Sequence, residues 1–145
     1  MIDYELINEK LKSGLTLRFD VGLSFNMPNA TQWLRNDPNV YVIGIEPHPN
    51  NFKSCCSHLE TLDAGDRCYL IEAAISDVDQ SREKDFYGLS GDPGTRSLCR
   101  PIGRFENLVD RVYTVETISL SEILDNLNYE KVSVLKTDTQ GNDLK

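Results

Sequence analysis

Short apolar runs alternate with stretches of helical periodicity along the first half of the chain. Runs rich in Val, Ile and Leu, bounded by Gly, Pro and Asp, indicate strands. Three strands are predicted, at residues 16–20, 40–45 and 68–74. Before and between them, apolar side chains recur every three or four residues, which indicates helices that pack by one face. These helical stretches are residues 2–11, 30–34 and 52–62.

The second half of the chain continues this alternation around a longer irregular stretch. A polar turn is predicted at residues 76–80, a short strand at 85–87, and a long loop at 88–101, which holds three Gly and two Pro. Residues 111–118 are rich in Val, Thr and Tyr and indicate another strand. Ser119 and Glu122 have the spacing of a capping box, ahead of a short helix to about Leu127. A further buried strand is predicted at residues 132–137, closed by Asp138.

Alternating strands and helices predict an α/β fold with a mostly parallel sheet, flanking helices and right-handed crossovers. The 145 residues fit one domain. We expect an N-terminal helical segment at residues 1–15 and an α/β core at 16–145. The sequence stops at Lys145, where a helix is expected to begin, so the core is interpreted as incomplete at its C-terminus.

Composition narrows the classes of partner and site. The net charge of −8 argues against a nucleic-acid partner, which would require clustered Lys and Arg. The sequence has no run of 18 apolar residues and no signal-peptide pattern near Met1, so we expect a cytoplasmic protein without a membrane partner. The four cysteines lack metal-ligand spacing, so buried thiols are expected rather than a metal site.

Acidic residues end the first two predicted strands. Asp20-Val21-Gly22 closes the first strand and Glu46-Pro47 closes the second, 26 positions later. In an open α/β sheet, ligands bind outside the carboxyl ends of the strands. A Gly there admits close backbone approach, and an acid on the second strand accepts hydrogen bonds from ribose hydroxyls. The pattern indicates a nucleotide-type site, although acids also cap helices and begin turns without any ligand.

Five stretches, in order, resemble the FkbM-type, S-adenosylmethionine-dependent methyltransferases, a class I family. They span most of the chain from Leu17 onward, at residues 17–22, 42–49, 72–77, 115–124 and 134–141. The resemblance implies a seven-stranded Rossmann-like sheet, of which this chain reaches about the fourth core strand. It also implies S-adenosylmethionine as the cofactor.

The resemblance places the cofactor at the strand ends and the loops that follow them. The implied cofactor-binding residues are Asp20, Gly22, Leu23, Asn26, Glu46, Pro47, Ala74, Ile75 and Asp77. Asp20 would hold the ammonium group directly or through water, and Glu46 would accept from the ribose hydroxyls. Ala74 and Ile75 would contact the adenine, and Asp77 would bind its exocyclic amine.

By the same resemblance, Asp138 would orient the methyl acceptor or act as a base, with Lys136 as a second catalytic candidate. Two positions depart from the family pattern. Asn26 stands where a second Gly is usual, and we expect it to preserve the turn because Asn tolerates positive φ. Gln140 stands where an acid usually precedes the Gly of the fourth-strand motif.

The predicted function is therefore methylation of a hydroxyl on a small molecule or sugar. A methyltransferase-like domain that only binds a partner remains an alternative. A nicotinamide-dependent oxidoreductase is a weaker one, because Gly22 lacks the companion glycines of the dinucleotide fingerprint. His48 is expected in a surface loop or, alternatively, beside the ribose. Oligomeric state is left open by the sequence.

Overall fold

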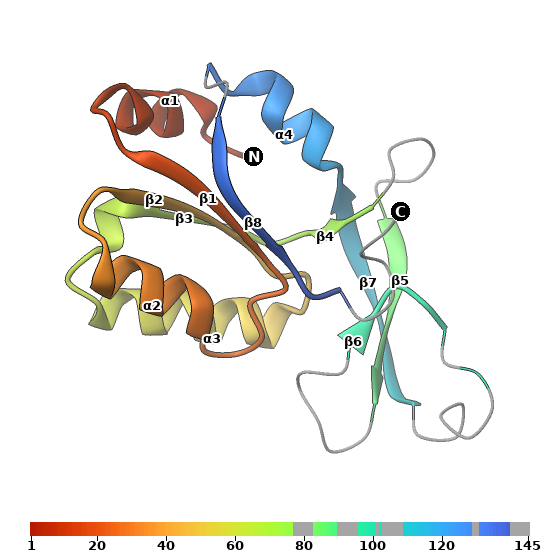
Figure 1. Ribbon diagram of the computed structural model, residues 1–145. Coiled ribbons are helices and arrows are strands. Elements are labelled where there is room, and N and C mark those ends of the chain that lie inside the picture. Colours follow the sequence, from red (N-terminus) through yellow and green to blue (C-terminus); the bar gives the residue numbers. More distant parts are fainter. Residues whose placement is uncertain (77–82, 90–95, 101, 103–108, 129–130, 140–145) are drawn as a thin grey trace.

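Four parallel strands form the central sheet of the computed structural model, which describes residues 1–76, 83–89, 96–100, 102, 109–128 and 131–139. In spatial order they are β3 (Cys68–Ile71), β2 (Val40–Ile45), β1 (Thr16–Val21) and β8 (Val132–Thr137) (Figure 1). The register sets Asp20 beside Gly44 of β2 and Lys136 of β8. The α/β fold class predicted from the alternation of elements is confirmed.

Helices cover both faces of this sheet (Figure 1). The helices α1 (Tyr4–Lys12) and α4 (Leu120–Asn126) lie over one face, and α2 (Pro28–Asn36) and α3 (Pro49–Thr61) lie over the other. Strand side chains alternate between the two layers because successive residues point to opposite faces. Phe19 therefore packs in a cluster with Ile7 and Ile123, whereas Val42 packs in a second cluster with Ala30 and Cys55.

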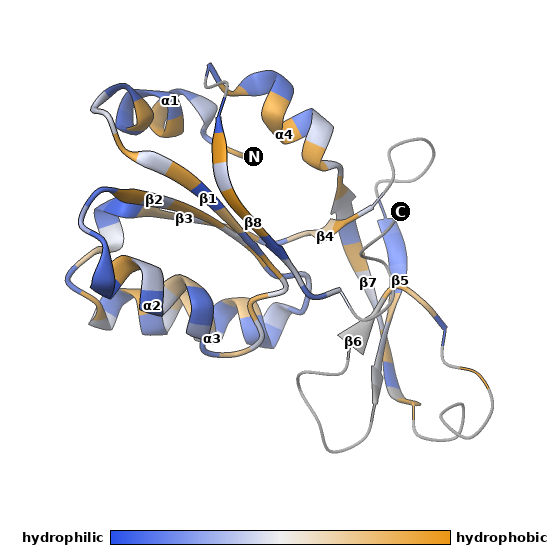
Figure 2. Ribbon diagram, viewed as in Figure 1, coloured by the Kyte–Doolittle hydropathy of each residue, from blue (hydrophilic) through white to orange (hydrophobic). Residues whose placement is uncertain are grey.

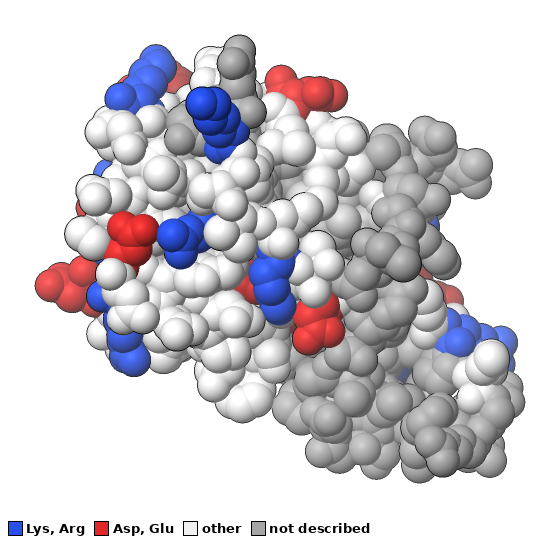
Figure 3. All heavy atoms as spheres, in the orientation of Figure 1, with Lys and Arg blue, Asp and Glu red and all other residues white. Residues whose placement is uncertain are grey.

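Figure 2 shows the same division by hydropathy, with apolar residues concentrated along β1 and β2 and polar residues prominent along the helices. No helix in the described part of the chain is long and apolar enough to cross a membrane. On the face drawn in Figure 3, Lys and Arg are interspersed with Asp and Glu rather than gathered in one stripe.

Side chains form hydrogen bonds with the backbone at the ends of several helices. The Asp3 carboxylate accepts from the Leu6 amide at the start of α1, and Ser119 accepts from the Glu122 amide at the start of α4, as predicted from the capping box. Arg67, at the end of the 3₁₀ turn η1 (Gly65–Arg67), reaches the C-terminal end of α2. Its guanidinium donates to the carbonyls of Leu34, Asp37 and Val40 at 2.8–3.1 Å.

A second sheet packs beside the first and was not predicted as a separate unit. Its order is β4 (Ala74–Ile75), β7 (Val109–Ile118), β5 (Glu83–Leu89) and β6 (Arg96–Ser97). β4 runs parallel to β7, and the β7–β5 and β5–β6 pairs are antiparallel. Its core consists of Ala74, Phe86 and Val115.

Two sequence predictions are corrected by this sheet. Residues 68–74 do not form one strand, because the chain leaves the first sheet after Ile71 and Ala74 pairs with Thr117 of β7. Residues 88–101 are not wholly a loop, because 88–89 belong to β5 and 96–97 form β6. Cross-strand pairing decides both cases, with β7 for Ala74 and between β5 and β6 for residues 88 and 96–97.

The strand β8 has the predicted bounds but is not buried. Val132, Val134 and Leu135 are 36%, 36% and 51% exposed. The reason is that β8 pairs with β1 along one edge, and no strand in the described part of the chain pairs with its other edge. The prediction of a buried strand at 132–137 was therefore wrong.

Candidate functional site

A cleft opens at the carboxyl ends of β1 and β2, with the second sheet as its far wall. It encloses about 540 Å³, part of which is open to solvent. Its lining combines strand ends of the first sheet with residues of β4 and β5 and the segment after β6. The lining residues are Val21, Gly22, Ser24, Ile45, Glu46, Pro47, Asn51, Ala73, Ala74, Ile75, Phe86, Leu98, Asp138 and Thr139.

Gly22 shapes the floor of this cleft. Its φ is +83°, in the left-handed region, and its amide donates to the Ile45 carbonyl at 2.9 Å. A Cβ on Gly22 would overlap the carbonyl oxygen of Asp138 and lie 3.0 Å from its carbonyl carbon. Both the backbone conformation and the close approach of β8 therefore require glycine at this position.

Glu46 links the loop after β1 to the start of α3. One carboxylate oxygen accepts from the Ser24 amide and the other from the His48 amide, each at 3.0 Å. The side chain is buried and lines the cleft. Each carboxylate oxygen of Glu46 thus holds one backbone amide, and each has more than one acceptor site.

Asp20 does not line the cleft. One of its carboxylate oxygens accepts from the Ala30 amide near the start of α2 at 3.0 Å, and the other lies 3.2 Å from Lys136 Nζ. Burial raises the pKa of this carboxyl, and the Lys136 ammonium opposes that rise. The structure places Asp20 behind the floor of the cleft, so its position does not support the predicted direct contact with a cofactor ammonium.

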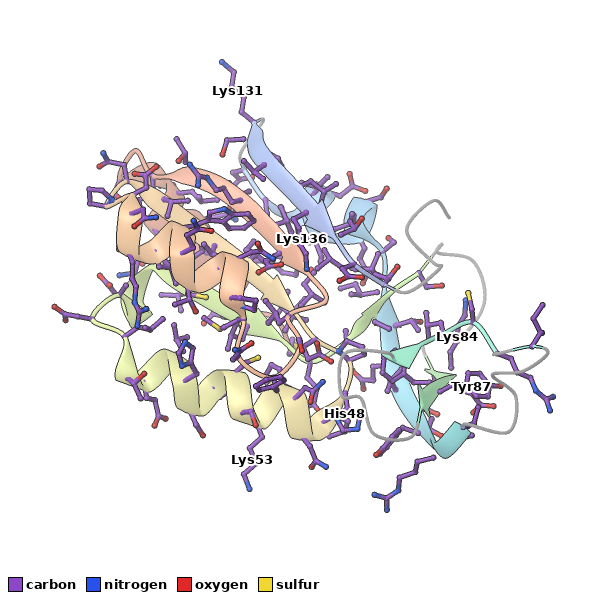
Figure 4. The ribbon with its side chains drawn as sticks, turned by 60° about the horizontal axis from the view of Figure 1, so that its bottom comes forward. His48, Lys53, Lys84, Tyr87, Lys131 and Lys136 are labelled. Carbon is purple, nitrogen blue, oxygen red and sulfur yellow. The ribbon has the colours of Figure 1, made fainter. Side chains whose placement is uncertain are left out.

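Lys136 supports the same floor from β8. Its ammonium donates to the Gly22 carbonyl at 2.8 Å and approaches the Val21 carbonyl at 3.4 Å, in addition to its ion pair with Asp20. In Figure 4, Lys136 lies beside the end of β1, whereas Lys131 extends away from the other end of β8. The ammonium thus has two backbone acceptors and one ion-pair partner, and its side chain is not part of the cleft lining.

Asp138 and Thr139 follow β8 and form the rim of the cleft opposite the second sheet. The Asp138 amide donates to the Val21 carbonyl at 3.0 Å, which continues the ladder between β8 and β1. The Asp138 residue is exposed. The backbone of Asp138 is thereby fixed to the sheet beside the cleft, which the residue lines.

Comparison with known families gives one match. A family model described as the methyltransferase FkbM domain matches residues 20–145. The chain belongs to the FkbM methyltransferase family. The match starts at Asp20 and includes all the strand ends that build the cleft. No curated protein and no solved structure matches the chain significantly.

Within this FkbM domain, several predicted cofactor-binding residues meet in one cleft. Gly22, Glu46, Pro47, Ala74 and Ile75 all line it, together with Asp138. Ala74 and Ile75 reach the cleft from β4 rather than from the end of β3. Their contacts with a cofactor remain predictions, and the residues themselves lie in the same cleft.

Leu23 and Asn26 lie outside the cleft of the FkbM domain. Leu23 is buried in the cluster beneath α2, and its methyl groups fill the space beside Gly44. Asn26 is exposed, and its φ is not positive. The expectation that Asn26 provides the left-handed residue of the turn was wrong, since Ser24 and Met27 have φ of 60° and 41°. Asp77 and Gln140 lie outside the described residues.

The contribution of the second sheet to the cleft wall of the FkbM domain was not predicted from the sequence. Phe86 lies on β5 and Leu98 follows β6, and both face residues of β4. Phe86 falls in the short strand predicted at 85–87, but no local pattern revealed its partner strand. Asn51, on α3, was likewise missed, although its position five residues after Glu46 places it in the next helix.

His48 is neither in a surface loop nor part of the cleft lining. It is fully buried, caps α3 by accepting from the Asn51 amide at 3.3 Å, and packs edge-on against Tyr113 of β7 with ring centroids 4.4 Å apart. His48 thus joins the two sheets of the FkbM domain. The prediction of a surface-loop histidine was wrong because the partner ring lies 65 residues away in the sequence.

Proposed function

We propose that this chain is an S-adenosylmethionine-dependent methyltransferase that methylates a hydroxyl group of a small molecule or sugar. The family assignment supports methyl transfer. The observation that carries the choice of cofactor is the buried Glu46 carboxylate, held at the end of β2 beside the Gly22 turn and lining the cleft.

The cleft fits the chemical parts of this cofactor. Glu46 would accept from the ribose hydroxyls, and the Gly22 turn would lie against the amino-acid end. Ala74, Ile75 and Phe86 provide apolar surface suited to the adenine. The ribose and the adenine would thus each meet a surface of matching polarity.

The bound cofactor would supply an electrophilic methyl group on a positively charged sulfur. The protein's contribution is then to hold the acceptor oxygen in line with that group, since orientation accounts for ~7–11 kcal/mol of barrier lowering in favourable cases. Asp138, at the exposed rim, is suited to accept a hydrogen bond from the acceptor hydroxyl and to take up its proton. Lys136 is not assigned this role, because its ammonium is engaged beneath the floor.

Isothermal titration calorimetry with S-adenosylhomocysteine tests the proposal. We expect binding with a dissociation constant of about micromolar order, or ~8 kcal/mol. Glu46→Gln should weaken it by about tenfold or more, because the neutral amide loses charge-assisted acceptance and turns an NH₂ toward a backbone donor. Glu60→Gln, which changes an exposed carboxylate on α3, is the matched control and should bind normally.

A titration with NADH distinguishes the competing enzyme class and should show no binding. Absence of heat and of a thermal shift with S-adenosylhomocysteine, for wild-type protein that is folded, would overturn the proposal. Equal affinities for wild type and Glu46→Gln would overturn the assignment of the ribose to Glu46.

A further inference from the structure

We propose that Asp20 and Lys136 form an ion pair of zero net charge, which positions the Gly22 turn and lets the cleft admit the positively charged methyl donor. This inference rests on the proposed function and concerns two residues that do not touch the cleft. It gives Lys136 and Asp20 a role beneath the floor, distinct from the catalytic role and the ligand contact that the resemblance implied for them.

The geometry shows how the pair positions the turn. Asp20 joins the start of α2 to β1 through the Ala30 amide, and Lys136 joins β8 to the same strand end through the Gly22 carbonyl. The 3.2 Å ion pair connects these two attachments. The backbone of Gly22 is therefore held at two points. Its amide donates to the Ile45 carbonyl, and its carbonyl accepts from Lys136.

Charge gives the pair a second effect. The ammonium of Lys136 lies directly behind the floor, where an unpaired positive charge would repel a cationic ligand. Asp20 has 1% of its side chain exposed and Lys136 has 25%, so solvent screens the charge of Asp20 less than that of Lys136. With the net charge of the pair at zero, the charged residues among the described lining of the cleft are Glu46 and Asp138, and both are acidic. The net field in the cleft then favours a cation.

The methyl donor and its demethylated product provide a direct probe of this field. S-adenosylmethionine carries one positive charge more than S-adenosylhomocysteine and is otherwise closely similar. A change that only loosens the turn weakens both ligands equally. A change in local charge alters the ratio of their affinities. The measured quantity is therefore the dissociation constant of each ligand, by calorimetry, and the ratio between them.

Four variants separate the two effects. Asp20→Asn keeps an oxygen that can accept from the Ala30 amide but leaves Lys136 unneutralised, so affinity for the donor should fall relative to the product by about threefold or more. Lys136→Gln should shift the ratio in the opposite direction, and Lys136→Arg should retain the wild-type ratio. The double variant Asp20→Asn with Lys136→Gln should restore it. Lys131→Gln removes a positive charge from the exposed end of β8 and serves as the control.

The outcomes are distinct from those that test the proposed function. If wild type binds neither ligand, the proposed function fails. If wild type binds both and the ratio is the same in Asp20→Asn and Lys136→Gln, the charge inference is overturned. If Asp20→Asn does not fold, the ratio of the two dissociation constants is compared between Lys136→Gln and Lys136→Arg instead. If neither Asp20→Asn nor Lys136→Gln folds, the pair serves stability alone, which also overturns the inference.

Discussion

At the scale of single residues, the role of each side chain at the candidate site is set by the groups that it contacts. The location of Gly22 and Glu46 at the cleft could be predicted from the sequence, because the apolar runs before them mark where two adjacent strands end. The surroundings of Asp20 could not, since its partner is the Ala30 amide, ten residues later. The location of His48 depended on Tyr113, which no local pattern reveals.

Gly22→Ala should abolish binding of S-adenosylhomocysteine and destabilise the fold. A left-handed residue other than Gly costs ~1–2 kcal/mol, and overlap with the Asp138 carbonyl adds to this. Gly14→Ala is the matched control, because Gly14 also has positive φ, at +94°, but nothing lies within 4 Å of its Cβ position. Urea denaturation should show the larger loss for Gly22→Ala. Equal losses would contradict the close contact with β8.

Buried thiols should resist alkylation in the folded protein. Burial raises the pKa of Cys55 and of Cys68 to about 12, so little thiolate forms at pH 8. Cys99 is only partly buried. Iodoacetamide at pH 8 followed by peptide mass spectrometry should label Cys99 well before Cys55 and Cys68, and should label all of them in urea. The rate at the two buried thiols should rise as pH rises toward 12. Rapid labelling of Cys55 under native conditions would contradict its burial.

At the scale of elements, hydrophobic periodicity located most helices and strands but not their partners. β2 and β8 have the bounds that the apolar runs predicted. The run at 68–74 was divided between two sheets, because hydrogen bonds to β7 capture Ala74. Strand pairing between segments 43 residues apart, such as Ala74 and Thr117, leaves no local signal in the sequence.

Arg67→Met should destabilise the fold through the C-terminal end of α2. The guanidinium donates to the carbonyls of Leu34 and Asp37 there and to that of Val40 at the start of β2. Losing hydrogen bonds to a charged group at a partly buried site lowers the free energy of unfolding by ~1.5–3 kcal/mol. Arg35→Met, at an exposed position on α2 itself, removes the same charge and should change the free energy of unfolding little. Chemical denaturation monitored by circular dichroism measures both. Equal effects would show that charge, not the carbonyl contacts, matters.

At the scale of the whole molecule, residues of both sheets line the cleft. The strand β8 has apolar side chains exposed at the surface. An edge strand with exposed Val and Leu is a template for association between chains. The sequence predicted this strand as buried, since its apolar composition alone does not reveal whether neighbouring strands cover it.

Leu135→Lys should reduce self-association of this chain. Leu135 is 51% exposed on β8, so a charge there disfavours pairing along this edge. Val112→Lys, at a site on β7 that is 50% exposed, alters net charge equally and should have a smaller effect. Light scattering coupled to size-exclusion chromatography over a range of concentrations provides the measurement. Identical profiles for all three proteins would show that β8 does not mediate association.

The clasp of β8 on Gly22 also has a consequence for biosynthesis. Lys136 lies 114 positions beyond the residue whose carbonyl it holds. A polypeptide emerging from the ribosome exposes β1, β2 and Glu46 early, since synthesis proceeds from the N-terminus. The nascent chain nonetheless lacks a finished cleft until β8 has left the exit tunnel, so a ligand that requires the whole cleft binds only after β8 has been synthesised.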